Sequence, residues 1–66
     1  MHNYRLYFMS RKGGHIEGFE PIEAVGDAAA TEVARLYQGS YPLELWWRHR
    51  KVMAFPALPN PLSLLP

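Results

Sequence analysis

The chain contains no cysteine among its 66 residues. Disulfide bonds and thiolate metal sites are therefore excluded as sources of stability. A domain of this length buries only about 60% of the surface that its unfolded chain exposes, so its stability is marginal. Association with a second chain is the usual reinforcement that remains for such a small core.

Long apolar runs and a large net charge are also missing. No segment reaches the roughly 20 apolar residues that a membrane-spanning helix needs. The first ten residues are interrupted by Arg5, and no small-residue cleavage site follows them. We therefore expect a cytoplasmic protein that does not contact a membrane. The formal net charge of +1 gives no general field to attract nucleic acid.

Proline is abundant, in contrast, and is concentrated near the end of the sequence. Four of the six prolines lie within residues 56–66, a segment that can form neither a regular helix nor a central strand. We therefore divide the chain into one domain, residues 1–55, and a Pro/Leu-rich tail, residues 56–66. The tail contains a P-x-x-P pattern of the kind that partner proteins bind. Its leucines could instead pack on a sheet of this or a neighbouring copy, or stay disordered in solution.

The spacing of apolar residues predicts two strands, one helix and two further strands. A period of two residues is typical of strands, and a period of 3.6 residues is typical of a helix. The strands are expected at residues 4–9, 15–23, 43–48 and 51–55, and the helix is expected to begin at Gly26 or Asp27 and to run to about Tyr37. Gly18 and Pro21 make the second strand an edge strand or the site of a bulge.

Short polar residues and glycines mark the ends of these elements. Gly13 and Gly14 supply the positive φ angles of a tight hairpin. Asp27 is a candidate N-cap for the helix, because its carboxylate can accept a hydrogen bond from a first-turn amide. Gly39 follows the helix where a left-handed C-terminal stop is expected.

These elements predict an α+β fold with a four-stranded antiparallel sheet. A right-handed crossover brings the third strand beside the first and gives the strand order 2-1-3-4. The strands richest in apolar residues then lie in the centre. The second strand, with proline and glutamates, and the fourth, which begins with Lys51, lie at the edges, where such residues discourage aggregation.

One helix can cover only one face of this sheet, and alternate residues of a strand point to opposite faces. We assign to the helix side the apolar residues Leu6, Phe8, Ile16, Ile22, Leu43, Leu45, Trp47, Val52 and Ala54. The uncovered side then carries aromatic, methionine and charged residues, namely Arg5, Tyr7, Met9, Glu44, Trp46, Arg48, Lys51, Met53 and Phe55.

The aromatic rings and methionines of the uncovered side form a patch of at least about 500 Å². This area matches the largest apolar patch that an ordinary monomer exposes. We therefore expect a small non-enzymatic interaction module that forms a homo-oligomer, with a dimer as the first expectation. The predicted interaction surface consists of Arg5, Tyr7, Met9, Trp46, Arg48, Met53 and Phe55, with Trp46 and Arg48 as anchors.

Single-stranded nucleic acid is the alternative partner for the same face. Bases stack on aromatic side chains that have cations beside them. Trp46, Tyr7 and Phe55 with Arg5 and the basic segment 48–51 provide this combination. The near-neutral net charge argues against it.

Catalytic, metal and cofactor sites have little support in the sequence. Three histidines, His2, His15 and His49, are dispersed without metal-ligand spacing. The acidic segment 17–23 suits a charged strand edge better than a pair of catalytic carboxylates. The glycine pair at 13–14 is followed by a strand, whereas a phosphate-binding loop is followed by a helix. We therefore expect no enzymatic activity and no cofactor.

The segments 4–8, 13–16, 27–30, 34–35 and 43–46 together resemble a family pattern. The pattern is that of short, uncharacterised bacterial proteins with a β-β-α-β-β arrangement. The resemblance covers residues 4–55 and not the tail. It implies the same fold, and it implies no activity.

Overall fold

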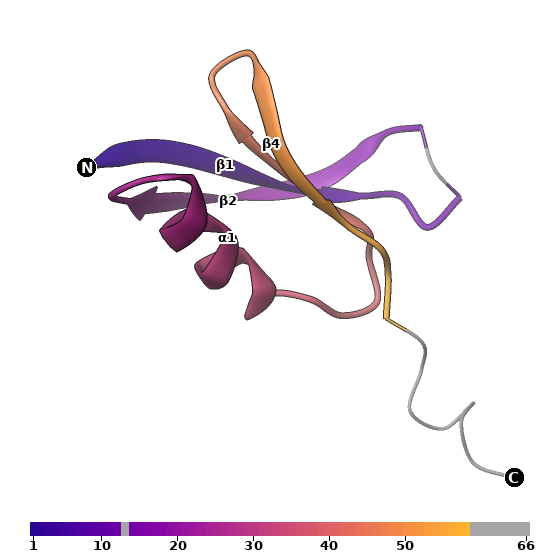
Figure 1. Ribbon diagram of the computed structural model, residues 1–66. Coiled ribbons are helices and arrows are strands. Elements are labelled where there is room, and N and C mark those ends of the chain that lie inside the picture. Colours follow the sequence, from indigo (N-terminus) through magenta and orange to yellow (C-terminus); the bar gives the residue numbers. More distant parts are fainter. Residues whose placement is uncertain (13, 59–66) are drawn as a thin grey trace, which may run out of the picture.

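The computed structural model describes residues 1–12 and 14–58 of the chain (Figure 1). Its elements are β1 (His2–Met9), β2 (Ile16–Ala24), α1 (Asp27–Arg35), β3 (Leu43–Trp47) and β4 (Arg50–Phe55). The four strands form one antiparallel sheet in the order β2-β1-β3-β4. The predicted α+β class, element order and strand order are confirmed.

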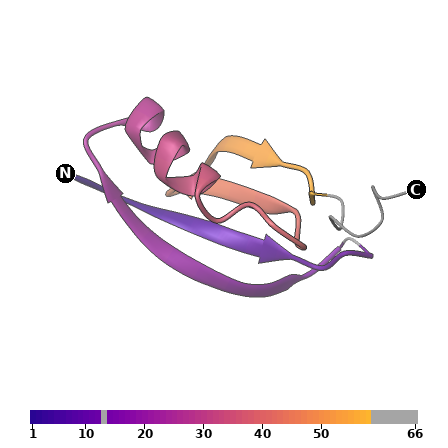
Figure 2. The ribbon, with the colours of Figure 1, turned by 90° about the horizontal axis from the view of Figure 1, so that it is seen from below.

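The hydrophobic core lies between α1 and the central strands. Leu6 of β1 is paired with Leu45 of β3, and both side chains are completely buried. Ala30 and Ala34 of α1 are completely buried as well. Because these two side chains are small, the backbone of α1 can approach the sheet closely, and Figure 2 shows the helix lying along one face of the sheet.

The helix begins at Asp27, as predicted, but both predicted capping residues are wrong. The N-cap is Gly26, which has an extended backbone and makes no side-chain capping bond. Asp27 is the first helical residue, and its carboxylate accepts hydrogen bonds from Tyr4 and Arg50 instead of capping the helix. The helix ends at Arg35, with Leu36 as a right-handed C-cap, so Gly39 does not provide the left-handed stop.

At the first hairpin turn the predicted positive φ is confirmed for Gly14, but the connection between Met9 and Ile16 is longer than the tight turn that was predicted. Gly14 has a φ of 97°, in the region that glycine adopts without steric cost. Gly13, the other glycine of this prediction, lies outside the described residues. The adjoining strand β2 is at the sheet edge, as Gly18 and Pro21 indicated.

Two bulges interrupt the strand pairing. In β2 the register shifts between the pairs Phe8–Gly18 and Met9–Ile16. In β4 it shifts between Leu45–Met53 and Trp46–Lys51. A bulge places one extra residue on one strand, so the residues beyond it exchange faces relative to simple alternation.

The predicted tail is described only as far as Leu58. The amide of Leu58 donates a hydrogen bond of 2.8 Å to the carbonyl of Gly39, so the first tail residues follow the loop after α1. Residues 59–66, on which the predicted tail contacts depend, lie outside the described residues. No helix within the described part of the chain is both long and apolar enough to cross a bilayer.

Candidate interaction surface and the adjoining notch

The sheet face opposite α1 carries a mixed aromatic and charged surface, which we call the open face. Strand pairing places on it Asn3, Arg5, Tyr7 and Met9 of β1, Ile16, Phe19, Pro21 and Glu23 of β2, Glu44 and Trp46 of β3, and Lys51 and Ala54 of β4. The helix and the loop after it lie on the other side of the sheet (Figure 2).

The two central strands bring together the predicted residues of this surface. Arg5 pairs with Trp46, and Tyr7 pairs with Glu44, so these four side chains are neighbours on one face. Met9 follows Tyr7 by one pleat on the same side. Arg48 lies at the end of the face, in the two-residue turn between β3 and β4.

Phe55 and Met53 are not part of this face, which corrects the prediction. Phe55 pairs with Leu43, is only 5% exposed and belongs to the core. The guanidinium of Arg35 in α1 lies 5.7 Å from its ring centroid. Met53 pairs with the buried Leu45 and therefore also points to the helix side. The bulge at Val52 is the cause, because it reverses the alternation between Lys51 and the end of β4.

The structure adds Phe19 and Ile16 to the open face. Both side chains are 53% exposed. Ile16 was expected on the helix side, and the β2 bulge moves it to the open face opposite Met9. Phe19 was not assigned to either face, although counting back by alternation from the buried Ile22 would have placed it on the open side.

Cations lie against the aromatic rings of the open face. The Arg5 guanidinium is 5.3 Å from the Phe19 ring centroid, and the Tyr7 and Phe19 centroids are 6.2 Å apart. The Lys51 ammonium is 5.9 Å from the Trp46 ring. Such contacts hold the rings in place while their outer surfaces remain accessible.

Glu44 joins Trp46 and Lys51 into one polar group on this face. Its Oε1 accepts a hydrogen bond of 3.0 Å from Trp46 Nε1, and its Oε2 lies 3.6 Å from Lys51 Nζ. The Trp46 side chain is therefore fixed by a hydrogen bond at its edge as well as by the cation on its ring.

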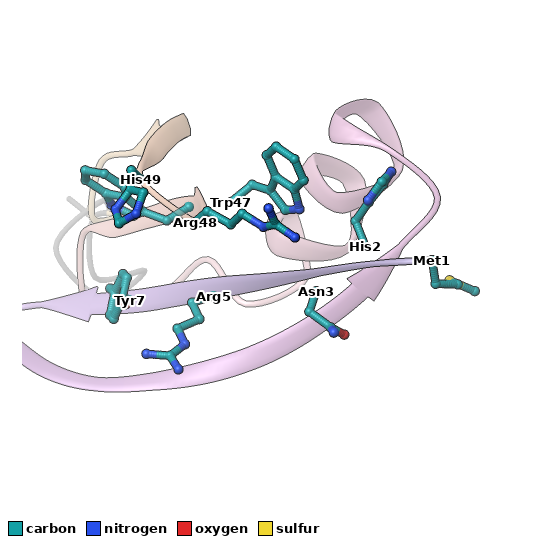
Figure 3. A pocket seen from close by; sticks show the side chains of 9 residues that line it. Met1, His2, Asn3, Arg5, Tyr7, Trp47, Arg48 and His49 are labelled. Carbon is teal, nitrogen blue, oxygen red and sulfur yellow. The ribbon is translucent and has the colours of Figure 1, made fainter.

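A hollow of about 570 Å³ opens at the end of the sheet where β1 extends beyond β3. The pairing of β1 with β3 covers Arg5 to Phe8, whereas β1 begins at His2. We call this hollow the notch; it is lined by Met1, His2, Asn3, Arg5, Tyr7, Trp46, Trp47, Arg48 and His49. Figure 3 shows Trp47 and His2 on one side of β1, with Asn3 and Arg5 directed to the other.

Trp47 forms the helix-side wall of the notch. The guanidinium carbons of Arg48 and Arg50 lie 5.0 Å and 5.6 Å from its ring. The His2 ring contacts it edge-on at a centroid distance of 5.4 Å. Trp47 therefore has two cations and an imidazole around it, and Arg48 reaches from the turn toward β1 (Figure 3).

A carboxylate behind this wall ties β4 and β1 to α1. Asp27 accepts hydrogen bonds from Arg50 Nη1 at 2.9 Å, from Arg50 Nη2 at 3.2 Å and from the Tyr4 hydroxyl at 2.9 Å. The bond from Arg50 contributes most to lowering the pKa of Asp27, followed by the bond from Tyr4. Burial, followed by the bond to Asp27, raises the pKa of Tyr4.

The candidate catalytic and metal-binding residues are not brought together. His2 lies against Trp47, His15 lies 3.1 Å from Glu17, and His49 is in the turn between β3 and β4. Within residues 1–12 and 14–58 no three histidine, aspartate or glutamate side chains are placed to hold a metal ion. Glu17, Glu20 and Glu23 lie along the exposed edge strand β2.

In comparisons with family models, curated proteins and solved structures, the chain matches none of them. The resemblance to short bacterial proteins and the expected cytoplasmic location therefore remain predictions.

Proposed function

We propose that the protein is a small non-enzymatic interaction module that forms a homodimer through its open face. The observation that carries this proposal is the contiguous group formed by Tyr7, Phe19 and Trp46, with Met9 and Ile16 beside them, on the sheet side that faces away from α1. Removing these apolar side chains from water lowers the free energy by about 25 cal/mol for each Å² that is buried.

The size of the face sets the expected strength of the dimer. Four strands about 4.8 Å apart and about six residues long give a face of roughly 20 by 20 Å. Two such faces bury about 800 Å² in total, which is below the roughly 1,200–2,000 Å² of a standard interface. The proposal is therefore a reversible dimer whose population depends on protein concentration.

The charges of the open face allow a second copy to bind. Arg5 and Lys51 supply two positive charges, and Glu23 and Glu44 supply two negative charges. In a dimer with two-fold symmetry both partners contribute the same patch, so a patch with charges of only one sign would be repelled by its copy. A balanced patch can instead pair its cations with the partner's carboxylates.

The outer edge of β2 favours face-to-face association over edge-to-edge pairing. Glu17, Glu20 and Glu23 are all exposed there, and Pro21 cannot donate a ladder hydrogen bond. Glutamates and proline discourage a second strand from adding to an edge. The sheet is therefore more suited to stacking on another sheet than to extending into a longer one.

The test introduces a carboxylate at the centre of the face. Trp46→Glu is expected to weaken self-association at least about tenfold, because aromatic anchors carry most interface energy. A second variant, Phe19→Glu, is expected to act in the same direction from an exposed position. Sedimentation equilibrium over a range of concentrations measures the mass relative to the 7.6 kDa chain.

Leu36→Glu is the matched control. Leu36 is 83% exposed, follows α1 on the other side of the sheet and receives the same added charge. This variant should dimerise as the unmodified chain does, and circular dichroism should show an unchanged fold for all three variants. Equal dimerisation of Trp46→Glu and Leu36→Glu would contradict the proposal, as would a chain that stays monomeric at every concentration.

A further inference from the structure

We propose that the notch binds a nucleoside phosphate, with the phosphate on Arg48 and the base on the indole of Trp47 beside it. This function is separate from dimerisation, because the notch lies at the end of the sheet and has walls, Trp47 and His2, that are not on the open face. The inference therefore does not depend on the proposed dimer.

The charge of the notch favours an anion. Its nine lining residues include two arginines, Arg5 and Arg48, and two histidines, His2 and His49, and none of the nine is an aspartate or a glutamate. Guanidinium groups offer several N–H donors in a planar arrangement that matches phosphate oxygens. Asn3 adds an uncharged side chain that can donate and accept hydrogen bonds.

The carboxylates nearest to the notch already have cationic or hydrogen-bonding partners, or face outward. Glu44 accepts from Trp46 and lies beside Lys51. Asp27 accepts from Tyr4 and from both terminal nitrogens of Arg50. Glu23 is exposed on β2, opposite Asn3. Arg48 therefore supplies the cation beside Trp47 in the notch, whereas the Arg5 guanidinium is directed to the other side of β1, against Phe19.

The aromatic walls favour a ligand that carries a planar ring. Trp46, Trp47 and Tyr7 line the same hollow as the arginines. Its volume of about 570 Å³ falls within the roughly 300–1,000 Å³ of small-molecule sites. Stacking of a base on an aromatic side chain is favourable for every base, so the walls select a ring but not a particular sequence.

The backbone of Arg48 supplies an independent observation. Arg48 has a φ of 55°, and it is the non-glycine residue with positive φ among the described residues. It occupies the first position of a two-residue hairpin turn, where glycine is preferred for such a φ. Strained residues of this kind are concentrated at binding sites. The strain here places a guanidinium at the mouth of the notch, against Trp47 (Figure 3).

The two tryptophans of the chain, both in the wall of the notch, report binding directly. Adenosine monophosphate is expected to quench their fluorescence saturably. Arg48→Gly should weaken this binding at least about tenfold, because a hydrogen bond to a charged group is lost. Glycine suits the turn, so this variant keeps its fold, which circular dichroism verifies.

Arg11→Gly is the control, since Arg11 is an exposed residue of the other hairpin and the substitution removes the same charge. It should bind adenosine monophosphate as the unmodified chain does. Equal loss in both variants would overturn the site, and so would full binding by Arg48→Gly.

Three further ligands test the class of ligand. Adenosine and inorganic phosphate should each bind at least about tenfold more weakly than adenosine monophosphate. Adenosine lacks the phosphate that Arg48 would bind, and inorganic phosphate lacks the ring that would stack on an indole. An eight-residue oligothymidylate tests whether the phosphate and ring come from a strand. Binding of the oligonucleotide without binding of any mononucleotide would overturn the proposal, and so would phosphate that binds as tightly as adenosine monophosphate.

Discussion

At the residue scale, Arg48 combines an unfavourable backbone conformation with a position against the ring of Trp47. Left-handed backbone places the Cβ atom of an L-residue too close to the following carbonyl oxygen. The cost is local, because Arg48 lies in a two-residue turn and its side chain is exposed. The strain and the guanidinium can therefore be separated by substitution.

Two substitutions that both remove the guanidinium isolate the backbone cost. Arg48→Ala is expected to have a free energy of unfolding about 1 kcal/mol lower than Arg48→Gly, because alanine keeps the Cβ atom and glycine does not. Chemical denaturation with urea measures the difference. If alanine were as stable as glycine at this position, the turn would not be strained at its φ of 55°.

At the same scale, single residues show the limit of interpretation from sequence. Tyr7 and Trp46 were correctly placed on one face, because residues 5–8 of β1 pair with residues 43–46 of β3 without a register shift. Phe55 was placed on the wrong face, although its own strand was predicted correctly. The sequence does not distinguish a buried aromatic residue from an exposed one when the pairing register of its strand is unknown.

At the element scale, the two bulges separate what was predictable from what was not. Both central strands are regular over the residues that they share, so their faces follow from alternation. Both edge strands contain a register shift. Gly18 in β2 indicated a bulge nearby, whereas no glycine or proline marks Val52 in β4. The face of Ile16, Met53 and Phe55 depends on these shifts.

Asp27 is the side chain that joins the start of α1 to two strands of the sheet. Its bonds to Arg50 and Tyr4 favour the ionised carboxylate, and the nearby His2 acts in the same direction when it is charged. The pKa of Asp27 is lowered in the folded state, so the unfolded chain binds more protons as the solution is acidified. The resulting stabilisation is present above the ordinary pKa and is lost as the pH falls through the lower folded value.

Asp27→Asn is therefore expected to lower the free energy of unfolding at neutral pH and to flatten its dependence on pH below about 4. Urea denaturation at a series of pH values provides the measurement. Glu32→Gln is the control, because Glu32 forms an exposed pair with Arg35 on α1, and exposed pairs contribute little. An acid dependence that Asp27→Asn leaves unchanged would show that this carboxylate does not tie the helix to the sheet.

At the scale of the whole molecule, the strand order was predictable and the notch was not. The order β2-β1-β3-β4 follows from short connections, a right-handed crossover and polar edge strands, all of which are visible in the sequence. The notch exists because the pairing between β1 and β3 stops at Arg5, whereas β1 begins three residues earlier, at His2. Arg48 and Trp46 were identified from the sequence, but their meeting with His2 and Asn3 was not.

The two proposals place different partners on adjoining parts of one molecule. The open face presents rings and balanced charges that suit a second copy of the chain. The notch presents arginines and indoles that suit a small anion with a ring. Arg5, Tyr7 and Trp46 contribute to both regions, so a bound nucleotide and a docked partner would contact neighbouring atoms of these residues.

The most direct test of the dimer is to identify the side chains that touch across it. In a mixture of isotope-labelled and unlabelled chains, isotope-filtered nuclear Overhauser spectra report only contacts between copies. We predict contacts between copies from the protons of Tyr7, Phe19 and Trp46. Contacts that come instead from the exposed residues after α1, Leu36 and Tyr41, or no contacts at concentrations where the mass exceeds that of one chain, would contradict the account.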